Sequence, residues 1–119
     1  MTDRRTMDLA ERREADRRLS ESRREARRDY VRYSKEAADA DTEYRKAKAT
    51  KFVELRFGGE AVESAKIQAE AAAADAKHRR DIAHSLAKAA LLKVEETERD
   101  SVTVRDLHAS SERVEGLAA

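Results

Sequence analysis

The 119-residue chain contains no cysteine, no proline and no tryptophan, and its only glycines are Gly58, Gly59 and Gly116. The lack of cysteine excludes disulfides and thiol chemistry and is compatible with a reducing cytoplasm. The lack of proline leaves almost nothing to interrupt regular backbone structure. No apolar run approaches the roughly 20 residues that span a bilayer, and the first residues lack the hydrophobic stretch of a secretory signal. We therefore expect a cytoplasmic protein with no membrane partner.

Aromatic residues are scarce and charged residues are abundant. Aromatic side chains make up 4% of the chain, whereas 43% of its residues are charged. The hydrophobic fraction of 39% includes many alanines, which favour helix but bury little area. Such a composition cannot fill a sizeable globular core, and it is typical of long helices that share an apolar seam.

The adjacent glycines Gly58 and Gly59 divide the chain into two nearly equal halves. Residues 1–59 carry 17 basic and 13 acidic side chains, and residues 60–119 carry 9 and 12. Antiparallel halves would bring unlike net charges together. We expect an all-α, antiparallel two-helix hairpin or coiled coil that assembles into an oligomeric bundle, with Gly58 as the left-handed residue that ends the first helix.

Apolar residues recur in both halves at alternating steps of four and three, which is the pattern of a heptad repeat. In the first half the pattern shifts at Lys51, and Asp39, Asp41 and Thr42 leave open whether the helix is continuous there. The predicted core and oligomer seam comprises Ala26, Tyr30, Tyr33, Ala37, Ala40, Tyr44, Ala47, Phe52, Leu55, Val62, Ala65, Ala69, Ala72, Ala76, Ala83, Leu86, Ala90, Leu91 and Val94.

The same patterns predict the organisation of the chain. Residues 1–34 form an arginine-rich helical arm, residues 35–57 the rest of the first long helix, and residues 58–59 the turn. Residues 60–115 form the second long helix, with Glu60 and Glu63 at its positive end, and residues 116–119 form a frayed tail.

Chemical sites are hard to find in this sequence. His78 and His84 are six residues apart, which does not stack two metal ligands on one helical face. No HExxH motif, no paired carboxylate beside a base and no glycine-rich phosphate loop occurs. We expect no catalytic residues, no bound metal and no cofactor, and hence no enzymatic activity.

Arginine pairs dominate the first 29 residues, where no lysine occurs. Interspersed acids favour a solvated helix face laced with salt bridges, and no aromatic residue alternates with these arginines to stack bases. Arginine nevertheless suits phosphates, so contact with nucleic acid or with the acidic groove of a protein remains open. The candidates for phosphate contact are Arg12, Arg13, Arg17, Arg18, Arg23, Arg24, Arg27 and Arg28.

The string EYRKAKATKFVELRF at residues 43–57, then Gly-Gly, then RRDIAHSLAKAALLKVEETE, resembles a family of small, largely uncharacterised bacteriophage helical-hairpin proteins. The resemblance covers about residues 40–113. Its motifs are a Tyr-Arg-x-Ala helix, an apolar-Glu-Leu-Arg turn and an Arg-x-Asp-apolar-Ala stretch. They correspond to Tyr44, Arg45, Ala47, Glu54, Leu55, Arg56, Arg80, Asp81, Ile82 and Ala83.

Such genes often lie among phage recombination and single-strand-handling genes, so the resemblance implies an accessory role in DNA recombination or replication, in the host cytoplasm. We expect a non-enzymatic interaction or adaptor protein that forms homo-oligomers and binds a protein partner. Direct nucleic-acid binding through the arginine arm is an alternative, though not the favoured one. A structural or scaffolding component of virion assembly is a second alternative.

Overall fold

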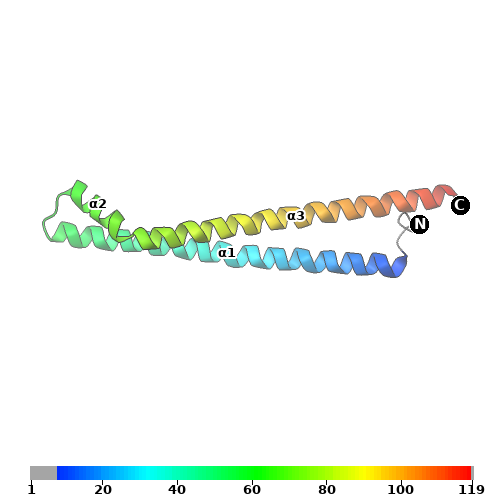
Figure 1. Ribbon diagram of the computed structural model, residues 1–119, viewed down its shortest axis with the longest axis horizontal. Coiled ribbons are helices and arrows are strands. Elements are labelled where there is room, and N and C mark those ends of the chain that lie inside the picture. Colours follow the sequence, from blue (N-terminus) through cyan, green and yellow to red (C-terminus); the bar gives the residue numbers. More distant parts are fainter. Residues whose placement is uncertain (1–7, 119) are drawn as a thin grey trace. The chain divides into compact units, whose positions relative to one another are not determined.

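The computed structural model describes residues 8–118, and it gives the side chains of residues 8–103, Arg105 and Leu107. Three helices account for almost all of these residues: α1 (Leu9–Phe57), α2 (Val62–Ala72) and α3 (Ala74–Ala118) (Figure 1). The described part of the chain contains no strand. The expectation of an all-α fold is confirmed.

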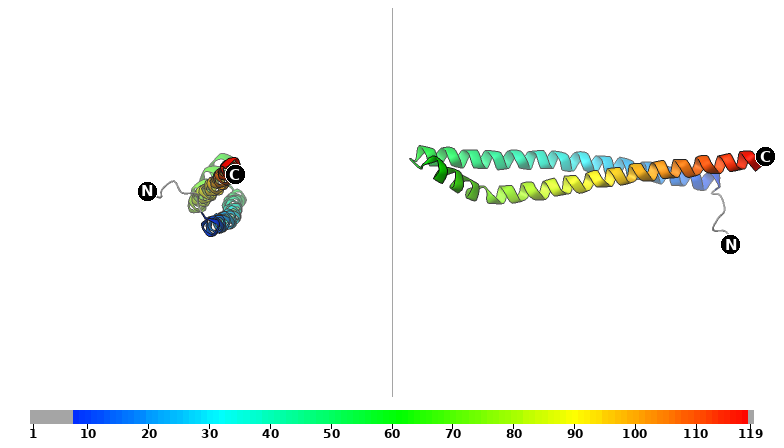
Figure 2. Two further views of the ribbon diagram at one scale, coloured as in Figure 1. Left: turned by 90° about the vertical axis from the view of Figure 1, so that its right-hand side faces the viewer. Right: turned by 90° about the horizontal axis from the view of Figure 1, so that it is seen from above.

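The helices form two compact units. One unit consists of Tyr30–Ala90, and the other combines the chain up to Asp29 with the chain from Leu91 onward. In Tyr30–Ala90, the second part of α1 turns back through α2 into α3, so this unit is a helical hairpin (Figures 1 and 2). In the other unit, the first part of α1 pairs with the second part of α3 through side-chain contacts described below.

Helix α1 begins where Asp8 caps it. The Asp8 carboxylate accepts a 2.7 Å hydrogen bond from the backbone N–H of Glu11, and the Glu11 carboxylate accepts one of 3.3 Å from the N–H of Asp8. This reciprocal capping box satisfies N–H groups that lack partners within the helix. The predicted arm therefore belongs to α1 from Leu9 onward, whereas residues 1–7 lie outside the described part of the chain.

The first helix continues without a break through residues 39–42, the stretch that the sequence left open. Thr42 is accommodated because its hydroxyl donates a 3.0 Å hydrogen bond to the carbonyl of Ala38, one turn earlier. This bond satisfies the hydroxyl within the helix, so a weak helix former at this position does not end it.

The turn after α1 is a Schellman motif that depends on Gly59. The N–H of Glu60 donates a 3.0 Å hydrogen bond to the carbonyl of Leu55, and the N–H of Gly59 donates one of 3.1 Å to the carbonyl of Arg56. Gly59 has a φ of 92°, the only positive value in the described part of the chain. The prediction that Gly58 is the left-handed residue was wrong. In a Schellman motif the left-handed residue directly precedes the donor of the bond that spans six residues, and that donor is Glu60, so the left-handed residue is Gly59.

We expect Gly59→Ala to lower the free energy of unfolding by about 1 kcal/mol, since a Cβ disfavours the left-handed backbone. Gly58→Ala is the matched control: its Cβ would meet carbonyl oxygens of Glu54 and Leu55 at 3.5 Å, which is ordinary contact. Urea unfolding followed by circular dichroism measures both variants. Equal losses would contradict the assignment of the strained position to Gly59.

The second half does not form the single helix predicted for residues 60–115. The helical path is interrupted at Ala73, where φ is −93° and ψ is 9°, and Figure 1 shows the change of direction between α2 and α3. Hydrogen bonds from Ala73 to Ala69 and from Lys77 to Ala73 persist across this point. The interruption is therefore a bend. Ala73 is only 1% exposed and lies in one cluster with Tyr44 and Ala76.

Helix α3 also extends past its predicted end. It continues to Ala118 and includes Gly116, so the residues predicted as a frayed tail are helical as far as Ala118, and Ala119 lies outside the described residues. A single glycine costs a helix only about 0.5–1 kcal/mol, which is too little to force an end at that position.

Most of the predicted seam faces the neighbouring helix. Seven of its members are buried, namely Ala26, Ala37, Tyr44, Ala65, Ala69, Ala76 and Ala90. Seven more are half-buried, namely Tyr30, Tyr33, Ala40, Phe52, Leu55, Ala83 and Val94.

Five predicted seam residues are exposed instead: Ala47, Val62, Ala72, Leu86 and Leu91. Their assignment to the seam is corrected by the observed register. The buried and half-buried residues of α1 that face the neighbouring helix form a contact line. Their average spacing is about 3.6 residues, the period of a straight helix, so after Tyr44 the contact line passes through Lys48 and not through Ala47. Beyond the bend the line passes through Ala73 and Ala87 in place of Ala72 and Leu86.

The resulting core consists mainly of alanine. In the described residues, no large side chain falls below 2% exposure, and the buried hydrophobic residues other than Tyr44 are all alanines. Small side chains let two helices approach closely, but each buries little apolar area. The larger apolar side chains of α2 and α3 are consequently found elsewhere, and their positions bear on function.

Candidate functional site

Tyr44 is the centre of the hairpin's core. Its side chain is 6% exposed and packs with Ala73 and Ala76. The guanidinium carbon of Arg80 lies 4.5 Å from the ring centroid, and the ammonium of Lys48 lies 5.5 Å from it. These are cation–π distances. Tyr44 is thus a packing residue with both cations over its ring, and it is not exposed for stacking on a base.

A groove of about 480 Å³ lies between α1 and α2, on the turn side of Tyr44. Its apolar floor is formed by Phe52 and Ala49 from α1 and Ala69 from α2. The side chains at its rim are charged: Arg45, Lys48, Lys66 and Glu70. An apolar group could enter this groove with a polar or charged group beside it.

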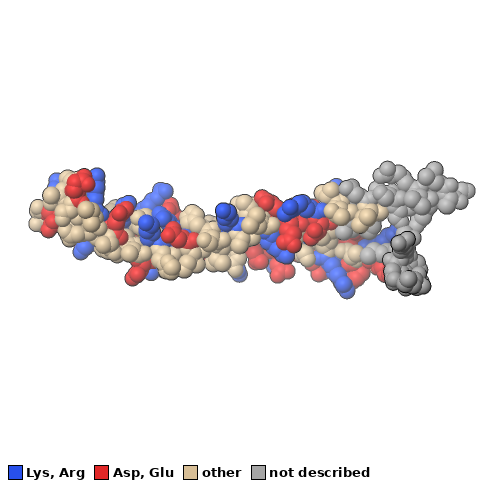
Figure 3. All heavy atoms as spheres, turned by 45° about the horizontal axis from the view of Figure 1, so that its top comes forward, with Lys and Arg blue, Asp and Glu red and all other residues tan. Residues whose placement is uncertain are grey.

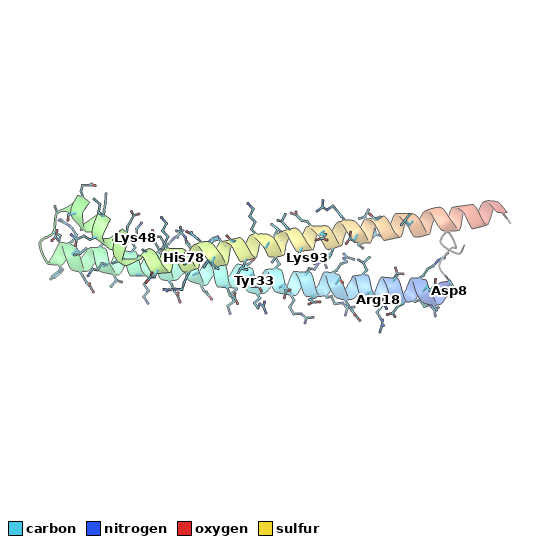
Figure 4. All side chains as sticks on the ribbon, viewed as in Figure 1. Asp8, Arg18, Tyr33, Lys48, His78 and Lys93 are labelled. Carbon is cyan, nitrogen blue, oxygen red and sulfur yellow. The ribbon has the colours of Figure 1, made fainter. Side chains whose placement is uncertain are left out.

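The rim charges of the groove are largely balanced within the hairpin. Lys48 lies 3.8 Å from Glu70, Lys66 lies 3.7 Å from Glu63, and Arg45 lies 3.1 Å from Asp41. Figure 4 shows Lys48 on α1 near α2. Because each cation has a carboxylate partner, the groove presents no unbalanced field that would select a charged ligand.

The other unit contains a polar cluster between α1 and α3, made by Arg23, Arg27, Glu98 and Ser101. Arg23 donates to both oxygens of the Glu98 carboxylate at 3.0 and 3.3 Å and to the Ser101 hydroxyl at 3.3 Å. Arg27 also donates to Glu98. Ser101 and the adjacent Thr97 are buried, and Nε of Arg23 is buried without a hydrogen-bond partner. The cluster joins positions more than 70 residues apart and fixes their register.

Four of the eight arginines proposed for phosphate contact are thereby engaged by carboxylates. Arg23 and Arg27 bind Glu98, whereas Arg17 and Arg18 bind Glu14 at 2.7 and 3.0 Å. Arg12 has an interaction as well. The remaining three, Arg13, Arg24 and Arg28, are exposed. Figure 3 shows acidic and basic side chains interspersed over the visible face.

The hydrogen bond from Arg27 holds the pKa of the Glu98 carboxyl below its ordinary value, and Arg23 acts in the same direction. Partial burial opposes this shift. Hydrogen bonds from Arg17 and Arg18 lower the pKa of Glu14 in the same way. A carboxyl whose pKa is lowered in the folded state binds a proton less readily when folded than when unfolded. Its stabilisation is therefore present above the unfolded pKa and is lost as the pH falls through the folded one.

We expect Glu98→Gln to lower the melting temperature at neutral pH, because the amide cannot hold both guanidinium groups. Glu96→Gln is the control, since Glu96 has only an exposed contact with Lys93 at 3.9 Å on the same helix. The deficit of Glu98→Gln relative to the wild-type chain should shrink as the pH falls below the ordinary pKa of a glutamate and through the lowered pKa of Glu98, because the wild-type carboxyl is then itself protonated. Thermal melts from pH 3 to pH 7 would test this, and a deficit independent of pH would contradict it.

Large apolar side chains lie on the outside of the helices. Phe57 is 93% exposed at the end of α1, and Ile67 is 69% exposed on α2. On α3 the exposed residues include Ile82, Leu86 and Leu92. The seam is built from alanine while isoleucine and leucine face outward, which is the reverse of what a self-sufficient helix pair requires.

The ionisable side chains that the structure describes form no candidate metal centre. Across the described part of the chain, no group of three or more His, Cys, Asp or Glu side chains could hold a metal ion. His78 and His84 are both exposed on α3, and the side chain of His108 lies outside the described residues. None of the helices, over the residues that the structure describes, is long and apolar enough to cross a membrane.

Comparisons with protein-family models, with curated proteins and with solved structures found no match to this chain.

Sequence reasoning missed several residues that the structure brings into contact. Lys48, Arg80 and Glu98 are charged, and a search for apolar periodicity passes over them. A signal was nevertheless present for Arg80 and Glu98. Arg80 lies at a heptad step between Ala76 and Ala83, and Glu98 directly follows Thr97, which lies one heptad step beyond Val94. Testing whether a charged residue continues the seam would have found Arg80.

Proposed function

We propose that this protein is a helical interaction or adaptor protein without catalytic activity, encoded by a bacteriophage and accessory to DNA recombination or replication. It acts by self-association and by binding a protein partner. The observation that carries the interaction role is the outward position of the large apolar side chains, from Phe57 through Ile67 to Leu92. Exposed apolar surface of this kind marks protein–protein contact.

The experiment combines sedimentation with capture from infected cells. We expect the purified chain to sediment as an oligomer and, when tagged, to recover phage proteins of the recombination or replication machinery. A variant with Phe57→Ser and Leu92→Ser should recover less of them, while Val31→Ser, a change at an exposed apolar position on α1, should not. A monomer that recovers no phage protein would contradict the proposal. A ladder of large homo-oligomers would point to a scaffold of virion assembly.

Direct binding of nucleic acid is the second candidate, and exposed arginines favour it. Within the described residues, Arg13, Arg24 and Arg28 have no ion-pair partner, so they are available to phosphates. If all three contact a DNA duplex, the logarithm of the binding constant should fall with the logarithm of salt concentration with a slope of about −2.7.

The triple change of Arg13, Arg24 and Arg28 to Gln should abolish this salt dependence. Replacing the engaged residues Arg17 and Arg18 by Gln is the matched control. Fluorescence anisotropy between 50 and 300 mM salt would measure both. Binding that persists in the triple variant would show that these arginines do not contact phosphate.

A further inference from the structure

A second line of mostly apolar residues follows the face of α2 and α3 that looks away from the seam. It comprises Ile67, Ala71, Ala74, His78, Ile82, Leu86 and Ala89, and we call it the outer stripe. Its steps of three and four keep these residues on one side of a helix. All of them are exposed and all belong to the unit Tyr30–Ala90.

The outer stripe is separate from the seam that packs on α1. At 100° per residue, the middle of the stripe lies roughly 140° around the helix from the line through Ala76, Ala83 and Ala90. Helix α1 therefore cannot cover both faces. The seam face of α2 and α3 packs on α1 within the hairpin, whereas the outer stripe is available to a second chain.

We propose that the outer stripe binds the outer stripe of a second copy of this chain, antiparallel, with the two-fold axis at His78. The inference rests on the proposed function, because it specifies the self-association on which that function depends. His78 is midway between Ile67 and Ala89, the ends of the stripe. A two-fold axis there makes each residue face the one equally distant on the other side of His78.

This pairing matches large side chains with small ones. Ile82 of one copy faces Ala74 of the other, and Ile67 faces Ala89. Leu86 comes opposite Ala71, displaced by one residue. Alternation of large and small residues across a helix pair lets the two faces interdigitate. A parallel arrangement would set Ile82 against Ile82 and Ala74 against Ala74, so one level would be crowded and the other empty.

The surface has a hollow next to Ala74, where the antiparallel pairing would place Ile82 of the second copy. It has a volume of about 460 Å³ and is lined by Ile67, Glu70, Ala71, Ala74, Lys77, His78 and Asp81. These residues come from α2 and α3 alone, on both sides of the bend at Ala73. Ile82 of the second copy faces Ala74 and would enter this hollow. Figure 4 labels His78, the lining residue on α3 at which the two-fold axis is proposed.

The charges beside the outer stripe are also complementary under this symmetry. Asp81 comes beside Lys77 of the second copy, and Glu70 comes beside Lys88 of the second copy. Both pairs lie on the same flank, and each occurs twice in a dimer. Within the described part of the chain, Lys77 and Lys88 have no ion-pair partner of their own. The second copy would place these carboxylates, which within their own chain lie 3.1 Å from Arg80 and 3.8 Å from Lys48, beside the two lysines.

Cysteine substitution tests the axis directly, because the natural chain has no cysteine and any disulfide must come from the introduced residue. Under mild oxidation we expect His78→Cys to give a covalent dimer, since the two thiols meet at the axis. Ala89→Cys alone should stay uncrosslinked, because its two copies would lie about 33 Å apart along the helices. Mixing Ala89→Cys with Ile67→Cys should yield the mixed disulfide.

Three results would overturn the proposal. Crosslinking of Ala89→Cys with itself as efficiently as His78→Cys would show a parallel pair. Crosslinking at neither position, in a chain that sediments as an oligomer, would place self-association on another surface. A chain that stays monomeric at concentrations up to 1 mM would leave no dimer to explain.

A charge exchange provides a second, independent measurement. Asp81→Lys and Lys77→Asp should each weaken dimerisation about tenfold, because each creates two like-charge contacts per dimer. The double variant should restore the wild-type dissociation constant to within about threefold. Glu95→Lys, which alters net charge equally on the exposed surface of α3, is the control and should have no such effect. Double-variant binding as weak as that of either single change would contradict the pairing.

These outcomes separate the inference from the proposed function. A chain that recovers phage proteins but does not crosslink through His78→Cys would retain its adaptor role and lose the antiparallel dimer. A chain that crosslinks as expected but recovers no phage protein would keep the dimer and lose the adaptor role.

Discussion

Replacing Tyr44 by alanine is expected to lower the free energy of unfolding by about 3 kcal/mol, a large share of the stability of a small helical protein. Tyr44 is the one large side chain among the buried hydrophobic residues described, and it lies against Ala73 and Ala76. Alanine at this position would leave a cavity bordered by small side chains that cannot fill it. The attraction of Arg80 and Lys48 to the ring would also be lost.

Two other variants test whether the loss of stability comes from the ring of Tyr44 and is specific to this position. Tyr44→Phe keeps the ring and both cations and should cost less than 1 kcal/mol. Tyr33→Ala removes a half-buried tyrosine from the same helix and should cost clearly less than Tyr44→Ala. Urea unfolding monitored by circular dichroism would measure all three. If Tyr33→Ala were as damaging as Tyr44→Ala, Tyr44 would not be the centre of the core.

An aspartate at position 73 is expected to destabilise the hairpin by about 3 kcal/mol. Ala73 is 1% exposed in the Tyr44 cluster, so a charge there would lose its hydration with no space for a partner. Ala72→Asp is the control, because Ala72 is exposed and has almost the same place in the chain. Aspartate is a weak helix former, which costs about 0.7 kcal/mol at the helical position 72 and no more than that at position 73, where the helical path is interrupted. The difference between the variants therefore isolates burial.

This comparison also tests the register of the second half. The heptad pattern of the sequence places Ala72 on the seam, whereas in the structure Ala73 occupies it. The sequence-based register requires Ala72→Asp to be the more damaging change, and the observed register requires the opposite. Thermal melts of the two variants at the same pH and salt concentration would distinguish the registers.

Much of the fold follows from the sequence by simple physical rules. The absence of proline, the high content of alanine and the glycine pair lead to two helical stretches joined at residues 58–59. Spacing alone identifies Tyr44, Ala65 and Ala69 as buried, because a step of three or four residues keeps side chains on one face. These conclusions depend on local geometry, which neighbouring residues determine.

The register errors arise where local geometry leaves a choice. Leu86 and Ala87 are both one helical step from Ala83, and hydrophobicity favours the leucine. In the structure Leu86 is 44% exposed and Ala87 lies on the contact line, because two helices in close approach accept a methyl group more readily than an isobutyl group. Size, and not hydrophobicity, decided which residue faces inward.

The sequence by itself determined the helical class, the position of the turn and the approximate apolar line along each helix, because backbone propensity and periodicity act over a few residues. Only the tertiary structure decided that Gly59 takes the left-handed backbone, that Glu98 joins Arg23 and Arg27, and that Ala73 marks a bend over Tyr44. Each of these depends on groups that the turn brings together from distant parts of the chain, or on which of two adjacent residues a neighbouring helix leaves room for.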